Sequence, residues 1–297
     1  MTATDITRFT GMTLPILLFI IPVAALAITA VPIIFTARTA RTVRQLQLAV
    51  AAITVLALTL LGQLQLTALP VALVLIVGCW AYQHYPESRY RSWLLAIVGV
   101  LSLAMALHVF TGFGNTALPL TISGTQTLDL WVNGDKGLAG IILLAGLASW
   151  RYHKLLSSLG IGLMGIVAII GLALLMGYPI EAKWGHWLLV FTVVNLFFVA
   201  LAEECFFRLI IQESLQQSLP KRWGALATAT LSIGITSGLF VIAHGGIASL
   251  PAAILLLMAG IVYGWIYWRT RSVWAATLIH AGLNIGHILL LPYPLFR

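Results

Sequence analysis

Long apolar stretches alternate with short polar segments along almost the whole chain. About ten such stretches occur, near residues 12–36, 47–67, 69–83, 93–112, 137–150, 157–178, 186–208, 224–244, 249–268 and 273–291. Several reach the roughly 20 residues that a helix needs to cross a bilayer, and the third and fifth are shorter. The pattern predicts an all-α fold, a polytopic membrane helix bundle with roughly 8–10 transmembrane helices.

Composition leads to the same class of protein. The chain is 61% hydrophobic and only 8% charged, whereas soluble domains are about one quarter charged. A soluble globular fold is therefore excluded. Because no repeat, low-complexity tract or linker interrupts the 297 residues, we expect a single membrane domain over residues 1–297.

The basic residues predict an orientation in the membrane. Loops rich in Lys and Arg are typically cytoplasmic, and here they alternate along the chain, which predicts that both termini lie outside. We expect a multi-pass protein of the cell (inner) membrane. The net charge of +8 then reflects topology and contact with anionic lipids of the bilayer, so no nucleic-acid partner is expected. Eleven of the sixteen Lys and Arg lie in these alternate loops: Arg38, Arg41, Arg44, Arg89, Arg91, Arg151, Lys154, Lys221, Arg222, Arg269 and Arg271.

Residues 112–136 form the longest polar stretch. Their Gly, Thr, Asn and Pro content predicts a loop. We expect a solvated connector, although Asp129, Asp135 and Lys136 are also candidates for substrate contact there.

Two acidic residues stand apart from the rest. Of the eight Asp and Glu, six map to loops or to the ends of apolar stretches, and only Glu203 and Glu204 lie inside one. A carboxylate at membrane depth costs about 3 kcal/mol on insertion scales, so such residues are candidates for function. No aspartate lies in any apolar stretch, which excludes a two-aspartate protease, and the H-E-x-x-H and G-x-S-x-G motifs are absent.

The spacing of this pair predicts different roles for its members. Glu204 precedes Arg208 by four residues, the favourable order for an ion pair on one helical face. Glu203 projects about 100° away around the helix and has no Lys or Arg three or four positions from it. We expect Glu203 to act as an acid or base. The alternative is that both glutamates only fix helix packing.

Three later residues supply possible partners for the glutamates. His244 follows Phe240 by one turn at the end of an apolar stretch. His280 and Asn284 are four residues apart, which places them on one helical face about 6 Å apart. Together with Glu203 they form a plausible polar constellation.

The order and spacing of these residues resemble one family, the glutamic intramembrane proteases that include the CAAX prenyl proteases and the bacteriocin-processing and immunity proteins. EECFFR (203–208) resembles its E-E-x-x-x-R motif, FVIAH (240–244) its F-x-x-x-H motif, and HAGLN (280–284) its H-x-x-x-N motif. The resemblance covers roughly residues 186–291, a protease core, and leaves 1–185 as accessory transmembrane helices. Leu209 departs from it, because many members have glycine after the arginine.

The resemblance implies an intramembrane endopeptidase. Glu203 is implied to take a proton from water that His244 helps to hold, and His280 and Asn284 to donate to the oxyanion. Glu204, Arg208 and Phe240 are implied as supporting residues. No cofactor or metal is implied, and the substrate is a membrane protein or a lipidated or hydrophobic peptide.

Two other functions fit the same residues. Glu203, His244 and His280 are also a possible zinc ligand set, which would make the protein a zinc-dependent intramembrane metalloprotease. A non-catalytic immunity, chaperone-like or transport protein would keep the motif residues as polar contacts.

The depth of His244 needs an explanation. It lies 22 residues after Arg222, about 33 Å along an unbroken helix, whereas His280 lies only about 13 Å from Arg271. We therefore expect residues 215–229 to run along the membrane interface before the next span begins.

Overall fold

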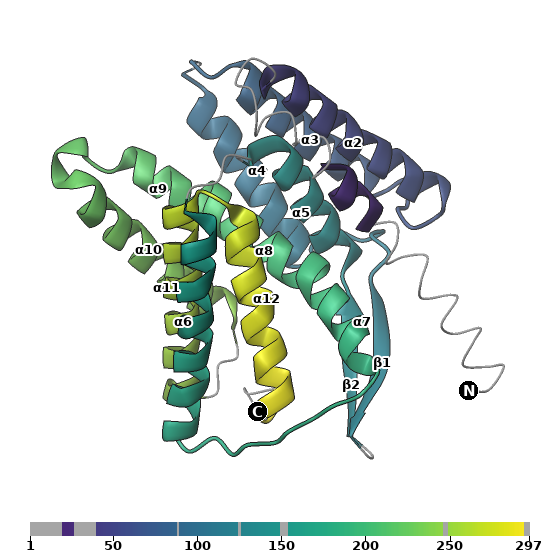
Figure 1. Cartoon of the computed structure of the whole chain (residues 1–297). Helices are drawn as coiled ribbons and strands as arrows, with labels where there is room; N and C mark the ends of the chain where they lie inside the picture. The colour runs from purple at the N-terminus through teal and green to yellow at the C-terminus, as the bar shows by residue number, and fades with distance from the viewer. Residues whose placement is uncertain are drawn as a thin grey trace. The chain divides into compact units, whose positions relative to one another are not determined.

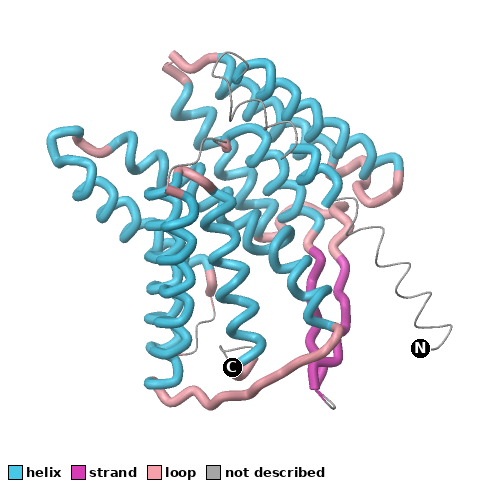
Figure 2. The backbone as a smooth tube through the Cα atoms, viewed as in Figure 1, coloured by secondary structure: helices cyan, strands magenta, loops and turns pink. Residues whose placement is uncertain are grey.

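Helices make up most of the protein in a computed structural model that describes residues 20–26, 40–87, 89–123, 126–148, 154–245 and 249–293 (Figure 1 and Figure 2). The predicted span near 12–36 lies largely outside these residues, and its described part, 20–26, is helical. Apart from the long helix that carries the glutamates, the other described helices are α2 (Ala40–Leu60), α3 (Leu69–His84), α4 (Arg91–Ala106), α5 (Gly134–Leu147), α6 (Leu155–Leu175), α10 (Gly224–Ala243), α11 (Leu250–Thr270) and α12 (Val273–Leu290).

The fold class predicted from the apolar pattern is confirmed. Within the described residues, six helices are long and apolar enough to cross a membrane, and α3 and α4 are shorter apolar helices. The six are Thr42–Leu60, Leu155–Leu175, Trp187–Ser218, Gly224–Ala243, Leu250–Thr270 and Val273–Leu290. The chain is therefore a multi-pass integral membrane protein with an all-α, polytopic bundle.

The loop prediction for residues 112–136 is wrong in detail. Strands β1 (Thr116–Ser123) and β2 (Gln126–Val132) form a two-stranded sheet, and α5 begins at Gly134. Buried and exposed side chains alternate along both strands, as at Leu118, Leu120 and Ile122 of β1. This period of two is typical of a half-buried strand. The turn-forming residues around the alternating positions led to the prediction of a loop instead.

The chain divides into two compact units. The first contains residues 1–118, 130–150 and 197–202, and the second contains 119–129, 151–196 and 203–297. In the first unit α5 is the core helix, because α2, α3 and α4 all pack against it and nearly all of its residues are buried. A close approach fixes one of these contacts: a Cβ atom on Gly146 would lie 2.6 Å from Cβ of Cys79 in α3.

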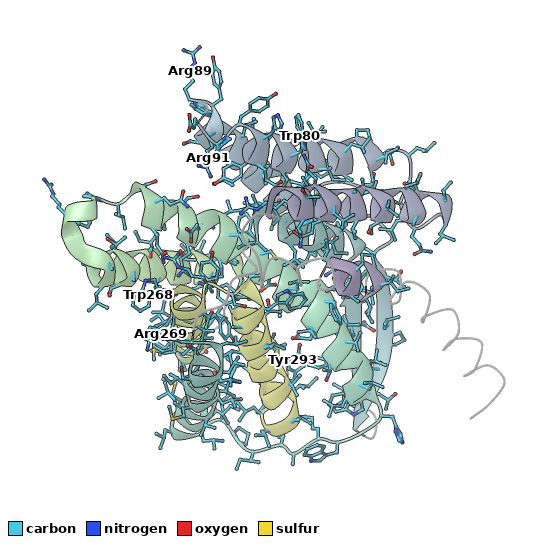
Figure 3. All side chains as sticks on the ribbon, turned by 45° about the horizontal axis from the view of Figure 1, so that its top comes forward. Trp80, Arg89, Arg91, Trp268, Arg269 and Tyr293 are labelled. Atoms are coloured by element: carbon cyan, nitrogen blue, oxygen red, sulfur yellow. The ribbon has the colours of Figure 1, made fainter. Side chains whose placement is uncertain are left out.

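An aromatic and basic group lies where α3 ends and α4 begins in the first unit (Figure 3). The ring of Trp80 stacks on His84 at 4.9 Å, and the guanidinium of Arg91 lies 4.5 Å from the ring centre of Tyr82. Such amphipathic groups are typical of the membrane–water interface.

In the second unit α11 is the central helix, since α6, α10 and α12 all pack on it. Small residues permit the close contacts: a Cβ atom on Gly260 of α11 would lie 3.1 Å from Cβ of Ser237 in α10. A side chain at Gly162 of α6 would meet Ile279 of α12 at 2.6 Å. These contacts hold together the helices that carry two of the motifs, 240–244 and 280–284.

The helix that carries the glutamates is irregular. It runs from Trp187 to Ser218 as α7 (Trp187–Val194), η2 (Asn195–Ala200), α8 (Leu201–Glu204), η3 (Cys205–Gln212) and α9 (Glu213–Ser218), of which η2 and η3 are π-helical. π-Helical turns are rare and are frequent at functional sites. Here they flank the four-residue α8 that ends with the two glutamates.

Candidate functional site

A buried carboxylate joins two of the predicted motifs. Oε2 of Glu204 accepts a hydrogen bond from Nε of Arg208 at 2.6 Å, and Oε1 accepts one from Nδ1 of His280 at 2.9 Å. The side chains of Glu204 and Arg208 are fully buried, and that of His280 is 3% exposed. The predicted pairing of Glu204 with Arg208 is present, and His280 is a second partner that lies on α12.

Arg208 continues this network toward α11. Its Nη1 donates to Oε1 of Gln212 at 3.0 Å, and Nε2 of Gln212 donates to the backbone carbonyl of Gly264 at 2.9 Å. A Cβ atom on Gly264 would lie 2.9 Å from Nη1 of Arg208, so a larger residue there would displace the guanidinium. The network fixes Arg208, and through it the orientation of Glu204.

Glu203 faces two imidazoles from other helices. Its Oε2 lies 3.8 Å from Nε2 of His244 and 4.0 Å from Nε2 of His280. The side chains of Glu203 and His244 are 15% and 28% exposed, whereas Oε2 of Glu203 itself is buried. Across the described part of the chain, no group of three or more His, Cys, Asp or Glu side chains has the spacing of a metal site.

An aromatic wall supports the two histidines. Nδ1 of His244 lies 2.8 Å from the carbonyl oxygen of Phe240, to which it donates, and the two rings are 4.4 Å apart. Phe240 is buried and also meets Phe207 and Tyr263 edge to face. Because the carbonyl can only accept, His244 carries a hydrogen on Nδ1, and a neutral ring presents the Nε2 lone pair toward Glu203.

Asn284 has a partner that the sequence did not indicate. Its Nδ2 donates to Oδ1 of Asn195 at 3.3 Å. Asn195 is buried and begins η2, about two turns before the glutamates on the same long helix. The amide of Asn284 is therefore oriented from outside its own helix.

The helix ends define the depth of the site. Oε2 of Glu213 accepts a hydrogen bond from Nη1 of Arg271 at 2.9 Å. These two residues mark one level, from which Glu203 and His280 each lie about 13–15 Å away along their own helices. Both therefore reach the same depth.

His244 reaches this depth by another path. Residues 215–229 belong to α9, η4 (Lys221–Trp223), the first part of α10 and the turn between them. Figure 1 shows the end of α9 and the start of α10 projecting from the other helices of this unit. The unbroken α10, of 20 residues, returns from beyond the Glu213–Arg271 level to place His244 beside Glu203. That residues 215–229 run along the membrane surface stays a prediction.

Three residues of this arrangement were missed by sequence reasoning. Gln212 follows Arg208 by four positions, so helical spacing held that signal. Asn195 is a polar residue inside an apolar stretch, which was also a usable signal. Tyr263 is stacked on His280 with ring centres 4.6 Å apart and planes inclined by 11°. No local sequence pattern predicts this contact.

The arrangement defines a class, a multi-pass helical membrane protein with a polar site among its helices. Residues 185–286 match the family model described as type II CAAX prenyl endopeptidase, Rce1-like. The resemblance to the glutamic intramembrane protease family is confirmed. This match indicates a membrane-embedded peptidase. Comparisons with curated proteins and with solved structures gave no match.

Proposed function

We propose that the protein is an intramembrane endopeptidase that hydrolyses a peptide bond with water activated by Glu203 and His244. The observation that carries the proposal is the convergence of Oε2 of Glu203 with Nε2 of His244, 3.8 Å away. This separation exceeds a direct hydrogen bond, and a water that bridges the two atoms would lie beside the line that joins them, about 2.8 Å from each. Glu203 takes a proton from that water while the water oxygen attacks the scissile carbonyl carbon. Glu203 later gives the proton to the leaving amine.

His280 supplies a donor for the tetrahedral oxyanion. Both oxygens of Glu204 already accept hydrogen bonds, one of them from Nδ1 of His280, so Nδ1 carries a hydrogen. A neutral ring then has only a lone pair at Nε2, and Nε2 donates only when the ring is an imidazolium. We assign His280 the charged form in the reaction, with Asn284 as the second donor through its side-chain amide.

The supporting residues balance charge in a site with little water. Glu204 lies between Arg208 and His280, so its single negative charge faces two cations. Glu203 supplies the second negative charge, and the four groups together are neutral. Phe240 holds the ring of His244. Burial of four charges costs least when they are paired and hydrogen bonded in this way.

The remaining features of the proposal concern substrate and location. The substrate is a membrane protein or a lipidated or hydrophobic peptide, because Glu203 and His280 lie inside apolar membrane-spanning helices. Residues 186–291 form the protease core and 1–185 the accessory helices. The protein lies in the cell (inner) membrane, with its Arg- and Lys-rich loops in the cytoplasm.

The test is a comparison of membrane-protein termini in cells that express wild-type protein, Glu203→Gln or Glu213→Gln. Glu213 is the matched control, because it lies on the same long helix and pairs with Arg271 instead of the histidines. Termini that are lost with Glu203→Gln and kept with Glu213→Gln identify substrates. An identical set of termini in all three strains would contradict the proposal.

A further inference from the structure

Tyr263 lies against the face of the His280 ring. The two rings are almost parallel, inclined by 11° with centres 4.6 Å apart, and Tyr263 is 2% exposed. The other aromatic neighbour, Phe240, meets His280 at 78° with centres 5.8 Å apart. One neighbour therefore offers its ring face, and the other meets the imidazole at a steep angle.

A ring face is the negative part of an aromatic side chain, and it attracts a cation within about 6 Å of the ring centre. The proposed function requires His280 as an imidazolium, because Nδ1 donates to Glu204 and only a charged ring also donates from Nε2. From this, and resting on that proposed function, we infer that Tyr263 is a positioning residue that holds the plane of His280 and stabilises its positive charge. The substrate is not contacted by Tyr263.

The two glutamates near His280 approach its ring nitrogens, whereas the uncharged ring of Tyr263 lies against its face. Glu204 pairs with Nδ1, and Glu203 lies 4.0 Å from Nε2. Parallel stacking also prevents the imidazole from tilting out of its plane. Hydrogen bonds that lie in the plane restrain this motion only weakly. The titratable and charged groups that face His280 or its partners are Glu203, Glu204, Arg208, His244 and Tyr263.

The chain offers a matched control one turn away. Tyr267 is also buried on α11, and its hydroxyl donates to Oε2 of Glu213 at 3.3 Å, away from the histidines. Removal of Tyr267 disturbs the same helix to a similar degree. It leaves the contacts of His280 in place.

The experiment uses purified full-length protein in lipid nanodiscs and a peptide from a substrate identified by the terminal comparison. Tyr263→Phe keeps the ring face and retains kcat within about twofold. Tyr263→Leu lowers kcat about tenfold, as expected for loss of a cation–π contact of 1–2 kcal/mol, with KM nearly unchanged. Because the imidazolium is less stable without the ring, the alkaline limb of the kcat–pH profile moves to lower pH.

Two further variants separate the ring's charge distribution from its packing. Pentafluorophenylalanine at position 263 keeps the shape of Phe and removes the negative ring face, so it shifts the alkaline limb as Tyr263→Leu does, even where the Leu variant unfolds. Tyr267→Leu leaves the pH profile as in wild type. Equal profiles for the Phe and pentafluorophenylalanine variants overturn the inference, as does a loss in Tyr263→Phe equal to that in Tyr263→Leu.

Failure of this inference is distinguishable from failure of the proposed function. Glu203→Gln is measured beside the other variants. If it retains turnover, the proposed function fails and the inference falls with it. If Glu203→Gln is inactive while the position 263 variants keep wild-type kcat and pH profiles, Tyr263 alone is removed from the site.

Discussion

Oε1 of Glu204 accepts a hydrogen bond from Nδ1 of His280 across 76 positions of sequence. The same carboxylate accepts from Arg208 through its other oxygen, so one buried anion links the long irregular helix to α12. A buried charge is stable only while its partners are present. Glu204 is thus a residue on which both folding and the geometry of His280 depend.

The two glutamates are predicted to respond differently to the same substitution. Glu203→Gln abolishes cleavage while folded yield stays near wild type, because the amide keeps the shape of the side chain and cannot accept the proton. Glu204→Gln lowers stability as well, since Arg208 and His280 lose their counter-charge. Breaking a fully buried pair costs about 3–5 kcal/mol. Turnover and thermal unfolding measured on the same purified samples check both statements.

Glu213→Gln serves as the control for this comparison, since Glu213 is partly exposed and pairs with Arg271. It retains turnover, and its effect on stability is small because exposed ion pairs contribute about 0–1 kcal/mol. Equal turnover and equal unfolding temperature for Glu203→Gln and Glu204→Gln would contradict the assignment of different roles to the two glutamates.

Direct activation of water predicts a particular response to chelators. If Glu203 and His244 act on water themselves, purified protein carries no stoichiometric metal, and its turnover survives prolonged treatment with a zinc chelator. Metal content by mass spectrometry and turnover before and after dialysis are the measurements. Stoichiometric zinc that disappears together with activity in His244→Ala would establish the metalloprotease alternative.

Much of the fold and of the candidate site was predictable from local sequence. Apolar stretches of about 20 residues predict spans because the bilayer fixes helix length. The pairing of Glu204 with Arg208 follows from helical spacing alone. His244 and His280 were indicated by motif order, and the structure brings both near Glu203.

What could not be predicted depends on tertiary contacts or on weak local signals. Tyr263 stacks on His280, and Asn195 binds Asn284, from other helices. The periodicity of a sequence does not predict contacts between helices that are far apart in the chain. The hairpin of β1 and β2 was missed because strands of seven or eight residues carry a weak alternation among turn-forming residues. The depth of His244 depends on how far the chain continues past Glu213 before α10 returns.

The amide of Asn284 is predicted to act mainly on the transition state. Asn284→Ala lowers kcat by about 10²–10³ with little change in substrate binding, because it removes a donor to charge that develops only during reaction. Asn284→Asp is at least as damaging, since a carboxylate would face the developing negative charge. Steady-state kinetics on the identified peptide measure both.

Asn195→Ala is the matched control for Asn284. It breaks the same 3.3 Å hydrogen bond and leaves the Asn284 amide in place. If the pair only ties two helices together, Asn195→Ala and Asn284→Ala have the same turnover and the same loss of unfolding temperature. A much lower kcat for Asn284→Ala at similar stability supports the oxyanion role, and near-normal kcat removes Asn284 from the site.

A separate prediction concerns the stability of the first unit, where Asp135 is fully buried in the first turn of α5. Its Oδ2 accepts from Nδ1 of His108 at 2.7 Å and from Nδ2 of Asn115 at 2.9 Å. His108 follows the end of α4 with φ of 57°, a conformation that costs a non-glycine residue about 1 kcal/mol. The side-chain contact with Asp135 offsets that strain.

Asp135→Ala is therefore expected to destabilise the protein by about 1–3 kcal/mol, because it removes a buried carboxylate that accepts hydrogen bonds from His108, Asn115 and the backbone N–H of Lys136. His108→Gly loses one hydrogen bond and relieves the backbone strain, so its net effect stays within about 1 kcal/mol. In the double variant the two losses do not add, because the residues share one contact. Denaturant unfolding in detergent micelles, followed by tryptophan fluorescence, measures all three, and strict additivity would show that His108 and Asp135 do not depend on each other.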